Sequence, residues 1–167
     1  MEKRWKAAVI TLSDKGYAGK REDRSGPLIK EMLEAKEYKV TEQILLPDEQ
    51  EEIEKCLCRL CDVYSVDLIL TTGGTGFSMR DRTPEATLAI AERNVPGIAE
   101  AMRFASLQIT PRAMLSRGVS VIRKRTLIIN LPGSPKAVRE NLEYILPALS
   151  HGIGILSGSE GECGKDA

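Results

Sequence analysis

The segment DLILTTGGTGFSMRDRTP, residues 67–84, determines the architecture that we expect for the whole chain. Its first part, residues 67–72, contains an unbroken Leu-Ile-Leu run, which is typical of a strand covered on both faces in a parallel sheet. Its second part, residues 73–83, is a polar loop with three glycines within four residues, and Pro84 suits the first turn of a helix. Because open α/β sheets bind ligands at the carboxyl ends of their strands, this loop is a candidate ligand site.

Apolar periodicity predicts further strands and helices that alternate along the chain. The expected strands are 5–12, 38–46, 67–72, 119–122 and 127–131; the expected helices begin at Ser25 and cover 49–64, 84–93, 97–108 and 135–146. Ser25, Asp48 and Ser134 are the residues expected to cap helices. The last two strands are too close in sequence for a parallel crossover, so if they pair they must be antiparallel.

These elements predict a three-layer α/β/α sandwich whose sheet is mostly parallel with one antiparallel strand. The 167 residues suit one domain, expected at residues 1–156, followed by a loose tail at 157–167.

Composition argues against several classes of protein. Lys and Arg number 24, as do Asp and Glu, so no net field attracts the chain to nucleic acid or to a membrane. One Trp, four Tyr and two Phe are few for a protein that stacks single-stranded bases. No uncharged stretch is long enough to span a bilayer, and no secretory signal is evident, so we expect a cytoplasmic protein with reduced cysteines.

Three of the four cysteines, Cys56, Cys58 and Cys61, invite a metal-binding interpretation. They lie in a predicted helix, where Cys58 is about 200° around the axis from Cys56, so the three sulfurs cannot converge on one ion. Buried or half-buried structural thiols are therefore expected.

Charge is distributed unevenly along the chain. Residues 101–139 contain no acidic residue but eight basic ones, namely Arg103, Arg112, Arg117, Arg123, Lys124, Arg125, Lys136 and Arg139. Residues 40–54 show the reverse pattern, with acidic residues and no basic residue. Ordinary solvated surfaces account for part of this, and the basic segment also suggests a surface for an anion.

The glycine loop is expected to bind an anion rather than to be only a tight turn, because glycine lets backbone N–H groups approach a phosphate closely. Hydroxyl groups at Thr72, Thr75 and Ser78 add donors, and Asp81 could cap the next helix or hold a metal. Neither the P-loop spacing nor the dinucleotide-binding spacing is present.

The order TTGGTG at 71–76 followed by RDRTPEAT at 80–87 resembles the signature of the molybdopterin adenylyltransferase family, which includes MogA and MoaB proteins. Three further blocks agree in order and spacing: LPDE at 46–49, AMLSR at 113–117 and NLPGSPKA at 130–137. The resemblance covers about residues 5–155, nearly the whole chain.

The resemblance implies a homotrimer that transfers AMP from MgATP to the terminal phosphate of molybdopterin, releases pyrophosphate, and hands its product to a molybdenum-insertion enzyme. The family's two functional aspartates correspond to Asp48 and Asp81, which would act in catalysis and in holding Mg²⁺. The remaining site residues implied are Thr72, Gly73, Gly74, Thr75, Gly76 and Ser78 of the glycine loop, which could hold the ATP phosphates; Ser116, Arg117, Ser134 and Lys136, which could receive the pterin and its phosphate; and Pro132 and Gly133 as further binding residues.

Alternatives remain for the residues and for the protein. Asp48, Asp81 and Ser134 are also good helix caps, and Arg117 and Lys136 could be solvated. A non-catalytic molybdopterin-binding or assembly protein on the same fold is the second hypothesis, although two metal-binding carboxylates favour the enzyme. The nucleotide-processing domain of competence-damage proteins is a distant third. Phe77 stands where some relatives have proline.

Overall fold

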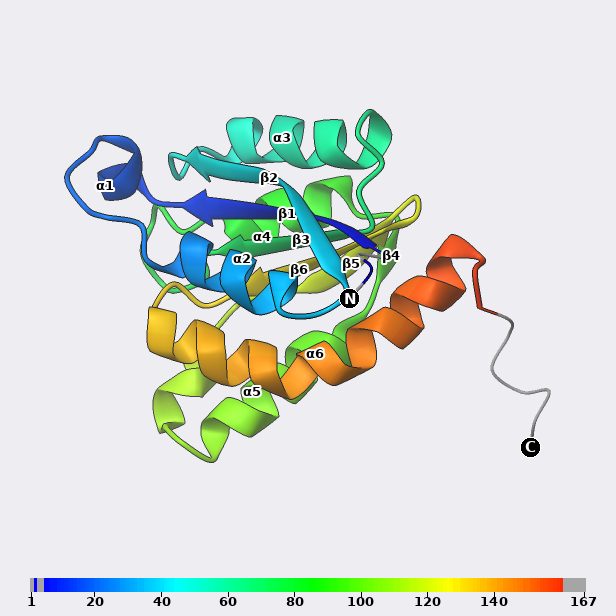
Figure 1. Cartoon of the computed structure of the whole chain (residues 1–167). Helices are drawn as coiled ribbons and strands as arrows, with labels where there is room; N and C mark the ends of the chain where they lie inside the picture. The colour runs from blue at the N-terminus through cyan, green and yellow to red at the C-terminus, as the bar shows by residue number, and fades with distance from the viewer. Residues whose placement is uncertain (1, 3–4, 161–167) are drawn as a thin grey trace.

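Six strands form one sheet in a computed structural model of the protein, which describes residue 2 and residues 5–160 (Figure 1). The order across the sheet is β2-β1-β3-β6-β5-β4. The strands are β1 Trp5–Leu12, β2 Tyr38–Leu46, β3 Leu68–Thr72, β4 Arg93–Asn94, β5 Ser120–Arg123 and β6 Thr126–Leu131. The pairs among β2, β1, β3 and β6 are parallel, whereas β5 is antiparallel to both of its neighbours. The predicted sheet with one antiparallel strand is therefore confirmed.

Helices cover both faces of this sheet (Figure 1). They are α1 Asp14–Tyr17, α2 Ser25–Glu34, α3 Gln50–Asp62, α4 Thr83–Ile90, α5 Pro96–Leu107, the 3₁₀ helix η1 Pro111–Leu115, and α6 Pro135–Ser157. Helices α3 and α4 pack on one face, and α2, α5 and α6 pack on the other. In the described part of the chain, no helix has the length and apolarity that crossing a membrane requires.

The central strand β3 is buried on both sides, as its apolar run predicts. Leu68 and Leu70 belong to the core beneath α2 and α6, while Ile69 belongs to the core beneath α3. All three side chains are fully buried. The run is continuous because alternate residues of a strand enter opposite cores.

Two predicted helix caps are wrong, because the residues have other partners. Ser25 is the first residue of α2, and its hydroxyl donates to the Gly133 carbonyl at 2.7 Å; the Asp23 carboxylate accepts from the Gly26 N–H instead. Helix α3 begins at Gln50, after Asp48, whose carboxylate is engaged elsewhere. Ser134 does cap α6, since its hydroxyl accepts from the Ala137 N–H.

Two predicted helix ends differ from the structure by three residues or more. Helix α6 continues past residue 146 and through Pro147 to Ser157, because Leu149 and Ile153 extend its buried stripe and offset the hydrogen bond that proline removes. The helix expected at 84–93 ends at Ile90, and the two-residue strand β4 follows. Of the expected tail, Ser157 is helical and residues 161–167 lie outside the described residues.

The cysteines of α3 are structural thiols, as predicted. Cys56 and Cys61 are buried in the core between α3 and the sheet, and Cys58 is half-buried against it. Burial raises the pKa of the Cys61 thiol to about 11 and also raises that of Cys56. Both groups are therefore neutral near pH 7.

We predict that Leu70→Ala destabilises the fold by about 2–5 kcal/mol, because it opens a cavity in a core that cannot fully collapse. Leu88→Ala is the matched control, since the Leu88 side chain is 48% exposed on α4. It should cost less than about 1 kcal/mol. Urea denaturation of both variants measures the difference, and equal losses would contradict the assignment of β3 as the buried central strand.

Candidate active site

The loops that follow the four parallel strands meet at one edge of the sheet, since β2, β1, β3 and β6 are neighbours. They surround a cavity of about 640 Å³. Residues from all four loops line it. They are Asp48 after β2, several residues between Ser13 and Ser25 after β1, Gly73, Gly74 and Asp81 after β3, and Gly133 and Ser134 after β6. The topology therefore brings both predicted aspartates to one cavity.

The bend after β3 requires glycine. Gly73 and Gly74 have φ of 95° and 70°, a region that residues with side chains rarely adopt. A Cβ at Gly73 would lie 2.3 Å from the Leu12 carbonyl oxygen at the end of β1. A Cβ at Gly74 would lie 2.2 Å from the Thr83 hydroxyl oxygen. The two glycines thus allow the β3 loop to lie directly against β1 and α4.

Hydrogen bonds within the protein, two of them from threonine hydroxyl groups, stabilise this bend. The Thr83 hydroxyl donates to the Gly73 carbonyl at 3.0 Å, and the Thr83 N–H donates to the Gly74 carbonyl at 3.1 Å. The Thr72 hydroxyl donates to the Pro132 carbonyl at 2.7 Å, which joins the β3 and β6 loops. Thr72 lines the cavity, but its hydroxyl hydrogen is committed to the scaffold.

Asp48 exchanges hydrogen bonds with Asp14. Its Oδ2 accepts from the Asp14 N–H at 3.0 Å, and its own N–H donates to Asp14 Oδ1 at 3.0 Å. Its Oδ1 is buried without a hydrogen-bond partner and lies 3.2 Å from where a Cβ of Gly74 would be. Burial raises the pKa of Asp48, and the nearby carboxylates of Asp14 and Asp81 add to this effect. An unpartnered buried carboxylate oxygen is a suitable ligand for a cation.

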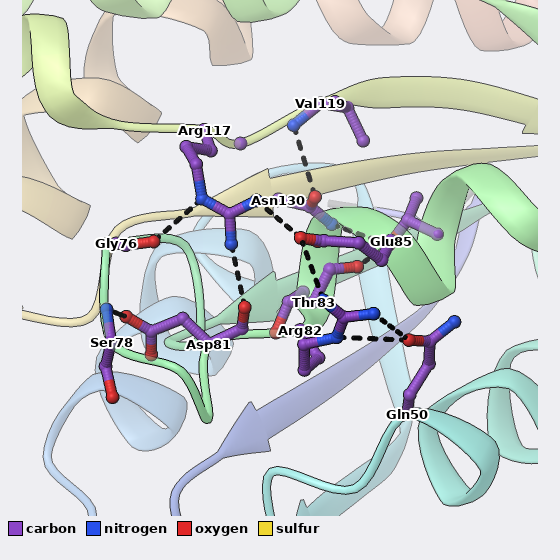
Figure 2. A network of polar contacts seen from close by, with 12 residues as sticks. Gln50, Gly76, Ser78, Asp81, Arg82, Thr83, Glu85, Arg117, Val119 and Asn130 are labelled. Atoms are coloured by element: carbon purple, nitrogen blue, oxygen red, sulfur yellow. Dashed lines mark hydrogen bonds and ion pairs between the residues drawn. The ribbon is translucent and has the colours of Figure 1, made fainter.

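Asp81 closes a turn instead of capping α4, whose cap position is Arg82. Its Oδ2 accepts from the Ser78 N–H at 3.0 Å (Figure 2). Its N–H donates to the Ser78 carbonyl at 3.0 Å. The helix-cap interpretation is thus wrong for Asp81, as it is for Asp48. Both side chains line the same cavity.

The donor set fits magnesium only if a substrate contributes. Among the described residues, no group of three His, Cys, Asp or Glu side chains could hold a metal ion. Mg²⁺, however, is commonly bound by one or two carboxylates together with substrate phosphates and waters. Asp48 and Asp81 supply two carboxylates beside a bend with room for a phosphate.

Sequence analysis missed the residues that connect the two aspartates. Arg80 donates from Nε and Nη2 to the Asp14 carboxylate, both at 3.0 Å, and from Nη2 to Glu49 at 2.8 Å. The hydrogen bond from Arg80 lowers the pKa of Asp14. Asp14 follows β1, so the rule that pointed to the loop after β3 would also have pointed to it.

The other predicted binding residues do not all lie together. Ser116 and Pro132 line a second cavity of about 260 Å³, with Thr75 and Gly76 from the other side of the glycine loop. Gly133 and Ser134 line the first cavity instead. Lys136, Ser78 and Arg117 line neither of these two cavities; Lys136 is exposed on α6, 3.8 Å from Glu140.

Two arginines of the acid-free segment form hydrogen bonds within the protein, and one of them, Arg103, also lines the second cavity. Arg103 donates to the Gly118 carbonyl at 2.8 Å, and Arg123 forms a two-pronged pair with Asp62. The arginines that line the first cavity are Arg21 and Arg24, in the loop after β1, together with Glu22 and Asp23 of the same loop.

Comparison with known proteins identifies the family of the chain. Residues 8–151 match the family model described as "Probable molybdopterin binding domain". The chain belongs to this family. It is 46% identical over 152 residues to the molybdopterin adenylyltransferase of Escherichia coli K12, covering 87% of this chain and 77% of that protein. It is 48% identical over 142 residues to that of Haemophilus influenzae, covering 84% and 72%.

A solved structure of this family has the same fold. The molybdopterin biosynthesis enzyme MoaB of Thermus thermophilus superposes with a TM-score of 0.89 at 48% identity, covering 93% of this chain and 98% of that one.

We predict that Gly74→Ala lowers the free energy of unfolding by about 2 kcal/mol or more, since it combines a left-handed φ with a clash against Thr83. Gly97→Ala is the control, because a Cβ there meets nothing within 4 Å and Gly97 lies in the first turn of α5. It should leave stability unchanged or raise it by up to about 1 kcal/mol. Urea denaturation measures both, and a neutral Gly74→Ala would contradict the requirement for glycine.

Proposed function

We propose that the protein is a molybdopterin adenylyltransferase, a nucleotidyltransferase that transfers AMP from MgATP to the terminal phosphate of molybdopterin. The single observation that carries the proposal is that Asp48 and Asp81 line one cavity at the glycine bend. The names of its relatives in Escherichia coli and Haemophilus influenzae support it. The cavity volume of about 640 Å³ suits a ligand of nucleotide size.

In the proposed reaction, an oxygen of the molybdopterin terminal phosphate attacks the α-phosphorus of ATP. The bond between the α-phosphorus and the oxygen bridging to the β-phosphorus breaks, and pyrophosphate leaves with that oxygen. Both reactants are anionic, so the protein contributes by positioning them and by balancing their charge.

Asp48 and Asp81 are the proposed Mg²⁺ ligands. Bound there with ATP, the ion would neutralise phosphate charge that the two carboxylates alone would repel. Asp48 Oδ1 supports this role because it is buried and has no hydrogen-bond partner. The hydrogen bonds from Asp14 to Asp48 and from Ser78 to Asp81 fix one oxygen of each carboxylate.

The glycine bend is the proposed cradle for phosphate. Gly73 and Gly74 bring backbone, with no side chain, to the cavity wall beside Asp48, and Arg21 and Arg24 also line this cavity, where Arg24 lies 3.4 Å from Glu22. The pterin is proposed to reach the second cavity, lined by Ser116 and Pro132 on the far side of the glycine loop.

We predict that Asp81→Asn lowers turnover by about 10²–10³-fold, because one preorganised charge is lost while the shape is kept. Release of pyrophosphate from purified protein, molybdopterin and MgATP measures it. Asp62→Asn is the control, since Asp62 pairs with Arg123 and Lys124 outside the cavity. Wild-type protein that binds both substrates without releasing pyrophosphate would instead indicate a non-catalytic binding protein.

The proposal also includes a homotrimer, a cytoplasmic setting and transfer of the product to a molybdenum-insertion enzyme. The trimer rests on the family resemblance. Exposed apolar side chains on α5, η1 and the residues between them support it, because such groups are often covered by another protein surface: Phe104, Leu107, Ile109, Met114 and Leu115. The three free cysteines of α3 suit a reducing compartment.

We predict a mass in solution of three times the 18.4 kDa chain, measured by light scattering. Phe104→Glu, on α5, should shift the mass toward the single chain because a charge would be buried at the interface. Tyr17→Glu changes a side chain of similar exposure, 60% against 62%, on α1 and should leave the mass unchanged. A wild-type mass of one chain would contradict the trimer.

A further inference from the structure

Arg117 makes contacts that differ from those of a substrate-binding arginine. Its Nε donates to the Gly76 carbonyl at 2.8 Å, its Nη2 donates to the Asp81 carbonyl at 2.7 Å, and its Nη1 donates to Glu85 Oε1 (Figure 2). Its backbone N–H also donates to the Thr75 carbonyl at 2.9 Å. Each of the three guanidinium nitrogens therefore already has a partner within the protein.

These contacts join the two ends of one loop. Gly76 and Asp81 bracket residues 77–80, and this stretch has little packing of its own, since Phe77 and Met79 are 71% and 95% exposed. A loop without buried side chains keeps its shape through hydrogen bonds, which here run from Arg80 within the loop to Asp14 and Glu49 and also hold the two ends of the loop. Arg117 provides two such bonds, and one of them is to the backbone of Asp81 itself.

Glu85 connects this arrangement to a rigid element. It lies in the first turn of α4, and its contact with Arg117 joins α4 to the segment before β5. The Glu85 carboxylate is half-buried, and its other oxygen is buried without a partner, so the ion pair with Arg117 is its principal contact. Arg117, Glu85 and the loop thus form one connected unit (Figure 2).

Arg117 also lies away from the space that substrates would fill. It lines neither the 640 Å³ cavity nor the 260 Å³ cavity. It lines a separate hollow of about 340 Å³, with Gly76, Ser78 and Asp81. A direct phosphate contact would require the side chain to leave three partners.

We propose that Arg117 is a positioning residue, which holds the Asp81 carboxylate at the cavity by bridging the Gly76 and Asp81 carbonyls and anchoring them to Glu85. The inference rests on the proposed function, in which Asp81 acts at the reacting phosphates. It replaces the expectation that Arg117 binds the pterin phosphate. Lysine cannot take this role, because its single ammonium group cannot reproduce the planar fork that reaches three acceptors.

The test is Arg117→Lys, which keeps the charge and removes the fork. We expect kcat for pyrophosphate release to fall about 10²-fold, since a displacement of about 1 Å at a reacting group costs that much. The KM values for MgATP and molybdopterin should change by less than about threefold, because ground-state binding is retained. Hydrogen exchange at the amides of Ser78 and Asp81 should become about tenfold faster or more, since both bond within the loop.

The matched control is Arg123→Lys. Arg123 also pairs with a carboxylate, Asp62, and donates to a backbone carbonyl, that of Ile90, but outside both cavities. It should leave kcat and the exchange of the loop unchanged. If Arg117→Lys does not fold, Glu85→Gln replaces it, with kcat expected to fall about fivefold because the bond loses its charge assistance.

Two outcomes would overturn the inference. A rise in KM that depends on salt, with kcat unchanged, would show that Arg117 binds substrate directly. Unchanged kinetics and unchanged exchange would show that the loop does not depend on it. If wild-type protein releases no pyrophosphate, the proposed function fails, and the exchange measurement alone decides whether Arg117 positions the loop.

Discussion

The Leu12 carbonyl oxygen occupies the space that a side chain on residue 73 would need, and this close approach governs the site. It arises because β1 and β3 are parallel neighbours whose carboxyl ends coincide. The loops after them can meet only if one has no side chains at the crossing, hence Gly73 and Gly74. The same crossing places the loop that carries Asp81 beside Asp48. The packing of the loops and the positions of both candidate metal ligands therefore depend on the same close approach.

Much of the fold follows from local pattern in the sequence. The run at 68–70 is apolar because its residues enter two cores, and this correctly predicts the central strand. The helix caps are harder to predict from the sequence. A Ser or Asp before a helix gives the same local pattern whether its side chain bonds that helix or a distant loop. Ser25 bonds Gly133, and Asp48 bonds Asp14, and neither contact is visible in local spacing. The predicted end of the last helix at residue 146 is wrong for a related reason, because the packing of Leu149 and Ile153 beyond Pro147 is a tertiary contact.

The sequence predicts where the candidate site lies better than it predicts what each residue does there. The strand–glycine–aspartate order identified the edge of the sheet and Asp81, whereas Asp48 was identified only by the family resemblance; both line the cavity. It did not identify Arg80, which connects the Asp81 turn to Asp14, nor separate the arginines that stabilise loops from those that face the cavity. A guanidinium group that bonds carbonyls has the same sequence signal as one that binds phosphate, so only its contacts distinguish the two roles.

The central claim is that Asp48 and Asp81 together hold a divalent cation against the phosphates of a nucleotide. Anomalous diffraction from crystals grown with Mn²⁺ and a non-hydrolysable ATP analogue tests it most directly. The account predicts one manganese peak coordinated by oxygens of both carboxylates and of the analogue. A manganese ion bound by phosphates alone, with either carboxylate turned away, would contradict it.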